Sequence, residues 1–95
     1  MIASLLISKE AEQDIDEAFT WYELRLIGLG RRFILSVEEG FNYIKANPEA
    51  FPITHRTLRK HVIHKFPFNV YYRINSDGVV EVIRVLHHKR NQKVR

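Results

Sequence analysis

The order of apolar and polar residues predicts a helical hairpin in the first half of the chain. Apolar side chains recur at helical spacing over about residues 9–26 and 30–47, with Ala11, Ile15, Ala18 and Tyr22 in the first stretch and Phe33, Val37, Phe41 and Ile44 in the second. Ser8 is a suitable N-cap, because its hydroxyl can accept a hydrogen bond from the first turn. Asn47-Pro48 ends the second helix, since the residue before proline avoids the helical region. Gly28-Leu29-Gly30 leaves room only for a tight turn, so we expect the two helices to lie antiparallel.

Extended segments are predicted on both sides of this hairpin. Leu5–Ile7 is short and apolar, and we expect a buried strand there. In the second half, Arg59–His64, Asn69–Asn75 and Val79–His88 are rich in residues that favour strands. Asn75-Ser76-Asp77-Gly78 predicts a hairpin turn between the last two. We expect the last strand, which is the longest, to be central.

These elements predict one α+β domain spanning residues 1–95, in the order β-α-α-β-β-β, with the helical hairpin packed on one face of a small four-stranded sheet. Side chains alternate between the two faces of a strand. We therefore expect Phe68, Val70, Tyr72 and Ile74 to meet the helices. Tyr71 and Arg73 should lie on the open face.

Charge is distributed unevenly along the chain. Residues 1–50 hold five Lys/Arg and nine Asp/Glu, a net −4, whereas residues 51–95 hold ten Lys/Arg and two Asp/Glu, a net +8. All five histidines also lie in the second half. This polarity favours a basic face that binds an acidic partner, either nucleic acid or protein.

The composition also argues against several classes of protein. There is no cysteine, which excludes disulfides and thiol chemistry and fits a reducing cytosol. The apolar N-terminal run is too short for a signal peptide or a membrane span. His61 and His64 are three residues apart and should point to opposite faces of a strand, so we predict no metal site and no cofactor. Glu12 and Asp16 are expected on a solvated helix face rather than in a catalytic cleft.

Three stretches of the sequence resemble the RelE/ParE toxin superfamily, in its plasmid-stabilisation, ParE-like branch. They are residues 11–22 with Gly28-Leu29-Gly30 and Phe33; Pro48–Pro52 leading to Arg59; and FPFNVYYRI (residues 66–74), the Asp77-Gly78 turn and VIRVLHHKRN (residues 82–91). The resemblance covers nearly the whole chain. It implies a small cytosolic toxin of a bacterial type II toxin–antitoxin system, neutralised by a cognate antitoxin that wraps around it.

The resemblance implies two alternative targets. One branch of the superfamily poisons DNA gyrase by binding it, and the other cuts mRNA on the ribosome. RNA cleavage requires a base, an acid and cations around the phosphate. Residues in the right region for a nuclease are Arg59, Arg73, Arg84, His87, His88 and Arg90. However, Asn69 stands where those nucleases carry an arginine, and no tyrosine follows Tyr72.

The sequence therefore favours a toxin that binds gyrase without catalysis, with a ribosome-dependent endoribonuclease as the alternative. The residues predicted to contact the target are Arg59, Tyr71, Arg73, Arg84, His87, Lys89 and Arg90. Those predicted to contact the antitoxin are Trp21, Leu29 and Arg31. Trp21 is at the edge of the core stripe, so it could equally be partly buried in the core. A nucleic-acid-binding module without toxicity is a third possibility, but no recognition helix or stacking platform supports it.

Overall fold

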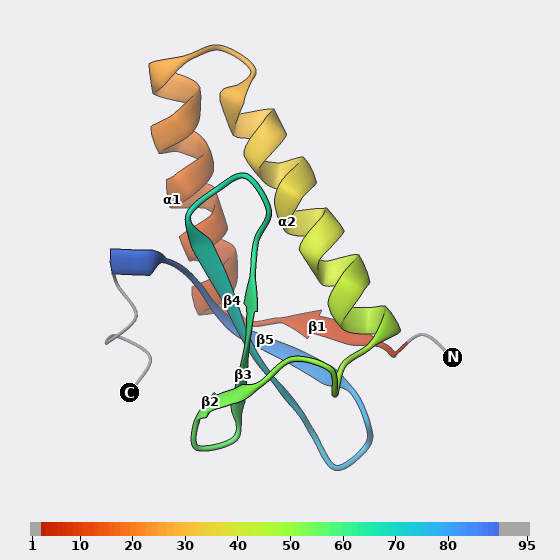
Figure 1. The fold of residues 1–95 in the computed structure, drawn as a ribbon. Helices are drawn as coiled ribbons and strands as arrows, with labels where there is room; N and C mark the ends of the chain where they lie inside the picture. Colours follow the sequence, from red (N-terminus) through yellow and green to blue (C-terminus); the bar gives the residue numbers. More distant parts are fainter. Residues whose placement is uncertain (1–2, 90–95) are drawn as a thin grey trace.

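The computed structural model describes residues 3–89 and shows two helices packed against one twisted sheet (Figure 1). The elements in chain order are β1 (Leu5–Ile7), α1 (Lys9–Arg25), α2 (Leu29–Ala46), β2 (Ile53–His55), β3 (Leu58–Val62), β4 (Phe68–Ile74) and β5 (Val80–His87). The strands lie in the order β1-β5-β4-β3-β2. Only β1 and β5 run parallel, and the other neighbours are antiparallel. The α+β class and the helical hairpin are confirmed.

The sheet has five strands rather than the predicted four. The additional strand is β2, which is three residues long and pairs with β3 through Ile53 and Arg59. It follows Pro52 directly and has no alternating pattern, so its sequence did not distinguish it from a loop. In addition, β4 is the middle strand of the sheet, and β5 lies between β4 and β1. The last strand is therefore an interior strand, as predicted, although β4 and not β5 occupies the middle position.

Side-chain hydrogen bonds fix both ends of α1. The Ser8 hydroxyl accepts a hydrogen bond from the Ala11 N–H at 3.0 Å, which confirms the predicted cap. At the other end, the Glu23 carboxylate accepts from the N–H groups of Gly28 and Gly30. Gly28 has a φ of 92°, which a residue with a side chain rarely adopts. The carboxylate and this glycine together fix the tight link between the helices.

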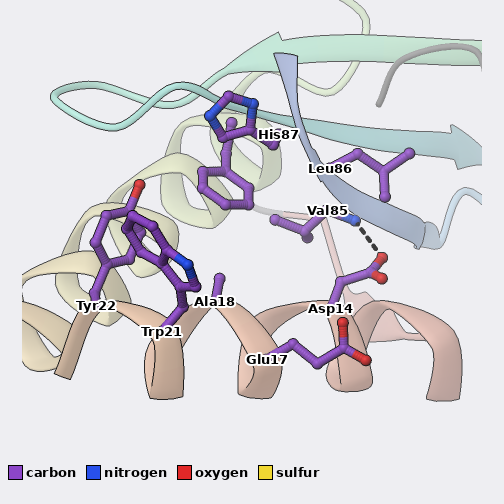
Figure 2. Close-up of a pocket in the computed structure, with 9 residues that line it drawn as sticks. Asp14, Glu17, Ala18, Trp21, Tyr22, Val85, Leu86 and His87 are labelled. Carbon is purple, nitrogen blue, oxygen red and sulfur yellow. Dashed lines mark hydrogen bonds between the residues drawn. The ribbon is translucent and has the colours of Figure 1, made fainter. Parts of the chain in front are cut away.

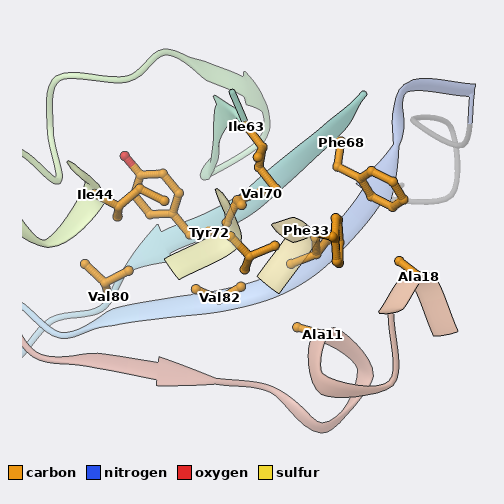
Figure 3. Close-up of a cluster of buried hydrophobic side chains, with 12 residues drawn as sticks. Ala11, Ala18, Phe33, Ile44, Ile63, Phe68, Val70, Tyr72, Val80 and Val82 are labelled. Carbon is orange, nitrogen blue, oxygen red and sulfur yellow. The ribbon is translucent and has the colours of Figure 1, made fainter. Parts of the chain in front are cut away.

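The core lies between the helices and the inner face of the sheet (Figure 3). Phe68, Val70 and Tyr72 project from β4 toward Phe33 of α2, as the alternation predicted. On β5 the register shifts, because Tyr71 pairs with Arg84 and Tyr72 pairs with Val82. The bulge between them places Val82 and Val85, three residues apart, in the same core.

Two other predictions about burial were wrong. Leu6 and Ile7 of β1 are 62% and 37% exposed, because β1 is an edge strand and not a buried one. Tyr71 was expected on an open face but is 4% exposed, and neighbouring Asn69 is 2% exposed. The Asn69 amide donates to the Tyr71 hydroxyl at 3.3 Å. The outer face of β4 is therefore covered at this point and does not offer Tyr71 to a partner.

Neither helix in the described part of the chain is long and apolar enough to span a lipid bilayer.

Candidate functional site

A groove of about 320 Å³ runs between α1 and β5 (Figure 2). Ala18, Trp21 and Tyr22 line it from α1, and Val85 and His87 line it from β5. The remaining lining residues are Asp14, Glu17, Phe68 and Leu86. Apolar and aromatic side chains dominate one end, and two carboxylates lie at the other.

The groove exists because β1 is much shorter than β5. β1 pairs with β5 only from Val80 to Val82, after which the chain turns at Ser8 into α1. Beyond Val82, side chains instead of strand backbone form hydrogen bonds with the edge of β5. The Ser8 hydroxyl donates to the Ile83 carbonyl at 2.8 Å, and the Asp14 carboxylate accepts from the Val85 N–H at 3.0 Å. Blocking a strand edge in this way hinders its pairing with another chain.

The Asp14 carboxylate also holds Arg84. It accepts from Arg84 Nε at 2.7 Å and from Nη2 at 2.8 Å, a two-point ion pair between side chains that are 27% exposed for Arg84 and 10% exposed for Asp14. This hydrogen bonding raises the pKa of Arg84 above its ordinary value, with smaller contributions from Glu10 and Glu17. The Arg84 guanidinium is therefore bound within the fold, and Asp14 compensates its charge. The sequence had instead suggested that Arg84 would be available to a target.

Trp21 forms the outer wall of the groove and is 52% exposed. The Arg25 guanidinium lies 3.6 Å from the centre of its ring, and the Tyr22 ring packs against it in a T-shaped arrangement with the two ring centres 5.1 Å apart. Tyr22 packs in turn against Phe66 of the core, and burial raises the pKa of its hydroxyl. These contacts hold Trp21 in place while leaving half of its surface open to solvent.

His87 forms the opposite wall. Its ring packs edge-on against Phe68 at 5.3 Å, and its Nδ1 accepts from the Lys89 N–H at 3.1 Å. An accepting Nδ1 carries no proton, so the neutral ring has its proton on Nε2. The sequence assigned Trp21 to the antitoxin and His87 to the target, whereas the structure places both on one groove.

The predicted arginines do not converge on one face. Arg59 lies opposite Tyr72 and donates to the carbonyls of Glu49 and Phe51 at 3.1 and 2.8 Å, holding the segment after α2. Arg73 pairs with Glu81 at 2.6 Å. Arg84 is held by Asp14, so each of the three arginines has its own intramolecular acceptor. By strand register, Arg84 lies opposite Tyr71 and shares the face of Arg73, whereas Arg59 lies opposite Tyr72 on the other face.

The remaining predicted residues lie in other parts of the molecule. His88 and Lys89 are exposed just after β5, and Arg90 lies outside the described residues. Leu29 is half-buried and Arg31 is exposed at the start of α2, away from the groove that Trp21 lines. Within residues 3–89, no group of three His, Asp or Glu side chains is arranged to hold a metal ion.

Asp14 is the functional candidate that the sequence reasoning missed. A signal was present, because residue 14 is three positions after Ala11 and four before Ala18, both of which are buried. A carboxylate beside an apolar helical stripe requires a partner when the helix packs. The identity of that partner, 70 residues away, could not be read from the sequence.

Comparisons with known proteins connect this fold to toxins. A family model described as the ParE toxin of the type II toxin–antitoxin system parDE matches residues 5–92. The structure is similar to a chain of the chromosomal ParDE TA system from P. aeruginosa, with a TM-score of 0.76, 21% identity, and coverage of 90% of this chain and 96% of that one. It is also similar to a chain of the toxin-antitoxin complex RelBE2 from Mycobacterium tuberculosis, with a TM-score of 0.64, 16% identity, and coverage of 92% and 99%. No curated protein matches the sequence significantly.

Proposed function

The chain belongs to the ParE toxin family of type II toxin–antitoxin systems, and on this premise we propose that it arrests bacterial growth by binding DNA gyrase and that a cognate antitoxin neutralises it. The observation that supports binding rather than catalysis is that the candidate arginines are already engaged within the protein. Arg59, Arg73 and Arg84 are each held by a different intramolecular acceptor. RNA cleavage would require cations gathered around one phosphate together with an acid and a base.

The target contact is proposed at the end of β5. His87 lines the groove, and Lys89, which follows it, is exposed. An apolar groove with an exposed cation two residues beyond its His87 wall suits a protein surface that offers an apolar side chain beside a carboxylate. Trp21, on the opposite wall, enlarges this surface and is proposed to take part in binding. Because gyrase is a cytosolic enzyme, the site of action would be the cytoplasm.

The experiment combines a purified assay with a cellular one. The full chain is added to gyrase and supercoiled DNA, and both supercoiling and trapped cleavage complexes are measured. We expect dose-dependent inhibition that weakens at least about tenfold in Lys89→Glu. Arg56→Glu, which reverses an exposed charge in the β2–β3 turn, is the matched control and should inhibit as the wild type does.

Messenger RNA ends distinguish this proposal from the nuclease alternative. During growth arrest, 5′ ends are mapped with and without the protein encoded by the neighbouring reading frame. Intact mRNA with an induced DNA-damage response supports gyrase binding. New ribosome-dependent ends that disappear in His87→Ala would overturn it in favour of RNA cleavage. His87 is a better probe than Arg84, whose replacement also removes the ion pair to Asp14.

A further inference from the structure

The link between α1 and α2 carries three large apolar side chains that are mostly exposed. Leu24, in the last turn of α1, is 78% exposed, and Leu26 and Ile27, which follow the helix, are 59% and 91% exposed. None of the three lines the Trp21 groove. The link lies at the far end of the hairpin, beyond the loops of the sheet (Figure 1). Leu24, Leu26 and Ile27 therefore form a projecting apolar surface, which we call the hairpin tip.

Three arginines flank the hairpin tip in the chain. Arg25 is the last residue of α1, and Arg31 and Arg32 are in the first turn of α2. All three are exposed, and within residues 3–89 none of them forms an ion pair. The Arg25 guanidinium stacks on the ring of Trp21, which holds it beside the tip. The hairpin tip thus has an apolar centre with positive charge on both sides.

The nearest carboxylate is occupied within the link itself. Glu23 is the only acidic residue between positions 18 and 37. Both of its carboxylate oxygens accept hydrogen bonds from the N–H group of Gly28, and one of them also accepts from Gly30. Residues 18–37 hold three arginines and one glutamate, a net +2. The exposed charge beside the apolar centre is therefore positive.

The rest of the first half of the chain has the opposite charge. Outside residues 18–37, residues 1–50 hold two lysines and eight Asp/Glu, a net −6. About 10 Å of helix separates Glu17 from Leu24. An anionic surface would therefore attract the tip and repel the opposite end of α1, so the hairpin would approach it tip first. The acidic residues in the first half of α1 are Glu10, Glu12, Asp14, Asp16 and Glu17.

An anionic lipid surface fits this arrangement better than other occupants do. A nucleic acid would meet the arginines but would leave the apolar centre uncovered. A second copy packed tip to tip would bring like charges together, which is unfavourable. A bound peptide requires a groove, whereas the tip projects. A bilayer instead accepts a projecting apolar surface at the boundary of its acyl chains, while its phosphate groups meet the basic residues.

We propose that the hairpin tip binds the surface of membranes that contain anionic phospholipids. Leu24, Leu26 and Ile27 enter the boundary between headgroups and acyl chains, and the flanking arginines bind lipid phosphates. The contact is peripheral, so it requires no helix that spans the bilayer. The inference does not rest on the proposed function, because neither gyrase nor an antitoxin takes part in it.

The test is sedimentation of the purified full chain with lipid vesicles. Vesicles made of equal parts of phosphatidylglycerol and phosphatidylcholine should bind the chain at least about tenfold more tightly than phosphatidylcholine alone. Raising the salt concentration from about 0.05 M to about 0.5 M should weaken this binding, because salt screens the arginines. Equal binding to both kinds of vesicle, or no binding to either, would overturn the proposal.

Matched charge variants test whether the tip is the part that binds. Arg31→Glu should raise the Kd for the mixed vesicles about tenfold or more, because each basic residue near the surface contributes roughly fivefold. Arg56→Glu makes the same change of net charge in the β2–β3 turn, at the opposite end of the molecule (Figure 1). It should leave the Kd within about threefold of wild type. Equal losses in the two variants would show non-specific attraction and overturn the proposal.

A second pair of variants tests the apolar part of the contact. Ile27→Gln should raise the Kd about tenfold, because a polar side chain enters the lipid boundary less readily. Leu6→Gln, which replaces a residue of β1 that is 62% exposed, should have little effect. Melting temperatures verify that all four variants are folded. Equal losses for Ile27→Gln and Leu6→Gln would contradict a contact at the tip.

The same variant identifies a protein that occupies the tip instead. If the chain self-associates without lipid, and Ile27→Gln abolishes this while vesicle binding is unchanged, the tip is a contact between two copies. If Ile27→Gln weakens gyrase inhibition and leaves vesicle binding unchanged, the tip belongs to the target contact. Either result would overturn the lipid proposal.

Discussion

Asp14 and Arg84, 70 residues apart in the sequence, form a two-point ion pair of 2.7 and 2.8 Å that joins α1 to β5. The same carboxylate accepts from the Val85 N–H, so one side chain satisfies both a guanidinium and a strand edge. Asp14 lies at the carboxylate end of the Trp21 groove (Figure 2). It fixes the position of α1 relative to β5 and hence the width of that groove.

We predict that Asp14→Ala lowers the free energy of unfolding by about 2 to 3 kcal/mol, because it leaves a partly buried cation and a backbone N–H without an acceptor. Urea denaturation of the purified chain measures the loss. Arg73→Ala is the comparison, since it breaks an ion pair to Glu81 whose arginine side chain is 52% exposed. It should cost less than about 1 kcal/mol. Equal losses for the two variants would contradict a special role for Asp14.

Tyr72 should make the fold sensitive to alkaline pH. Its hydroxyl donates to the Pro48 carbonyl at 2.6 Å, and burial raises its pKa to about 12, slightly opposed by Arg59. An unfolded tyrosine ionises near pH 10, so the unfolded chain loses its proton first as pH rises. The stability from Tyr72 is therefore present below pH 10 and is lost between about pH 10 and 12.

Tyr72→Phe should reduce the loss of stability between about pH 10 and 12. At neutral pH it should lower the free energy of unfolding by about 1 kcal/mol, because a hydrogen bond is missing. Thermal melts from pH 8 to 12 measure both effects. Part of the slope will remain, because burial also raises the pKa of Tyr22. If Tyr72→Phe loses stability with rising pH as steeply as the wild type does, Tyr72 is not the cause of the alkaline sensitivity.

His61 should have the opposite effect at acidic pH. Burial lowers the pKa of its ring, and the nearby Glu39 opposes the shift. The ring packs 4.4 Å from Phe51, and a side chain added at Gly40 would come within 3.2 Å of it. Protonation is thus easier in the unfolded chain. Stability should be full above about pH 6.5 and should fall as pH drops below that value.

The check is denaturation at pH 5 and pH 7.5 in the wild type and in His61→Gln. The free energy of unfolding should differ less between the two pH values in His61→Gln than in the wild type. His88→Gln, which replaces an exposed histidine, should retain the wild-type difference. A smaller difference in His88→Gln than in His61→Gln would show that another group causes the acid sensitivity.

Trp21 is the only tryptophan in the sequence and is half-exposed in its groove. Its fluorescence therefore reports directly on whether a partner occupies that groove. We expect gyrase to shift its emission to shorter wavelength, because binding would remove water from the indole. Gyrase binding without a shift would exclude Trp21 from the contact.

The helical hairpin could be predicted because its signals are local. The apolar stripes, the Ser8 cap and the glycines of the turn depend on residues close in sequence, and the structure bounds both helices within one residue of the prediction. The alternation of β4 likewise placed Phe68, Val70 and Tyr72 in the core. The Asn75–Gly78 turn was also confirmed, with the Asn75 side chain accepting from the N–H groups of Asp77 and Val79.

The candidate site could not be predicted to the same degree. Alternation assigned Tyr71 to an open face, but the burial of that face depends on what the rest of the chain places over it. The basic residues were read as one surface, but Arg59, Arg73 and Arg84 each found a different acceptor. The sequence gives the number of cationic side chains, but it does not show which acceptor each of them meets in the fold.

The sequence by itself determined the class of fold, the family resemblance and the two helices, because these follow from periodicity and from short-range signals. The tertiary structure decided which residues share a surface. It brought Trp21 and His87 to one groove, separated Leu29 from them, and neutralised Arg84 with Asp14. The physical reason is that the short β1 and the β5 bulge set where α1 lies against the sheet, and both are properties of strand pairing between distant residues.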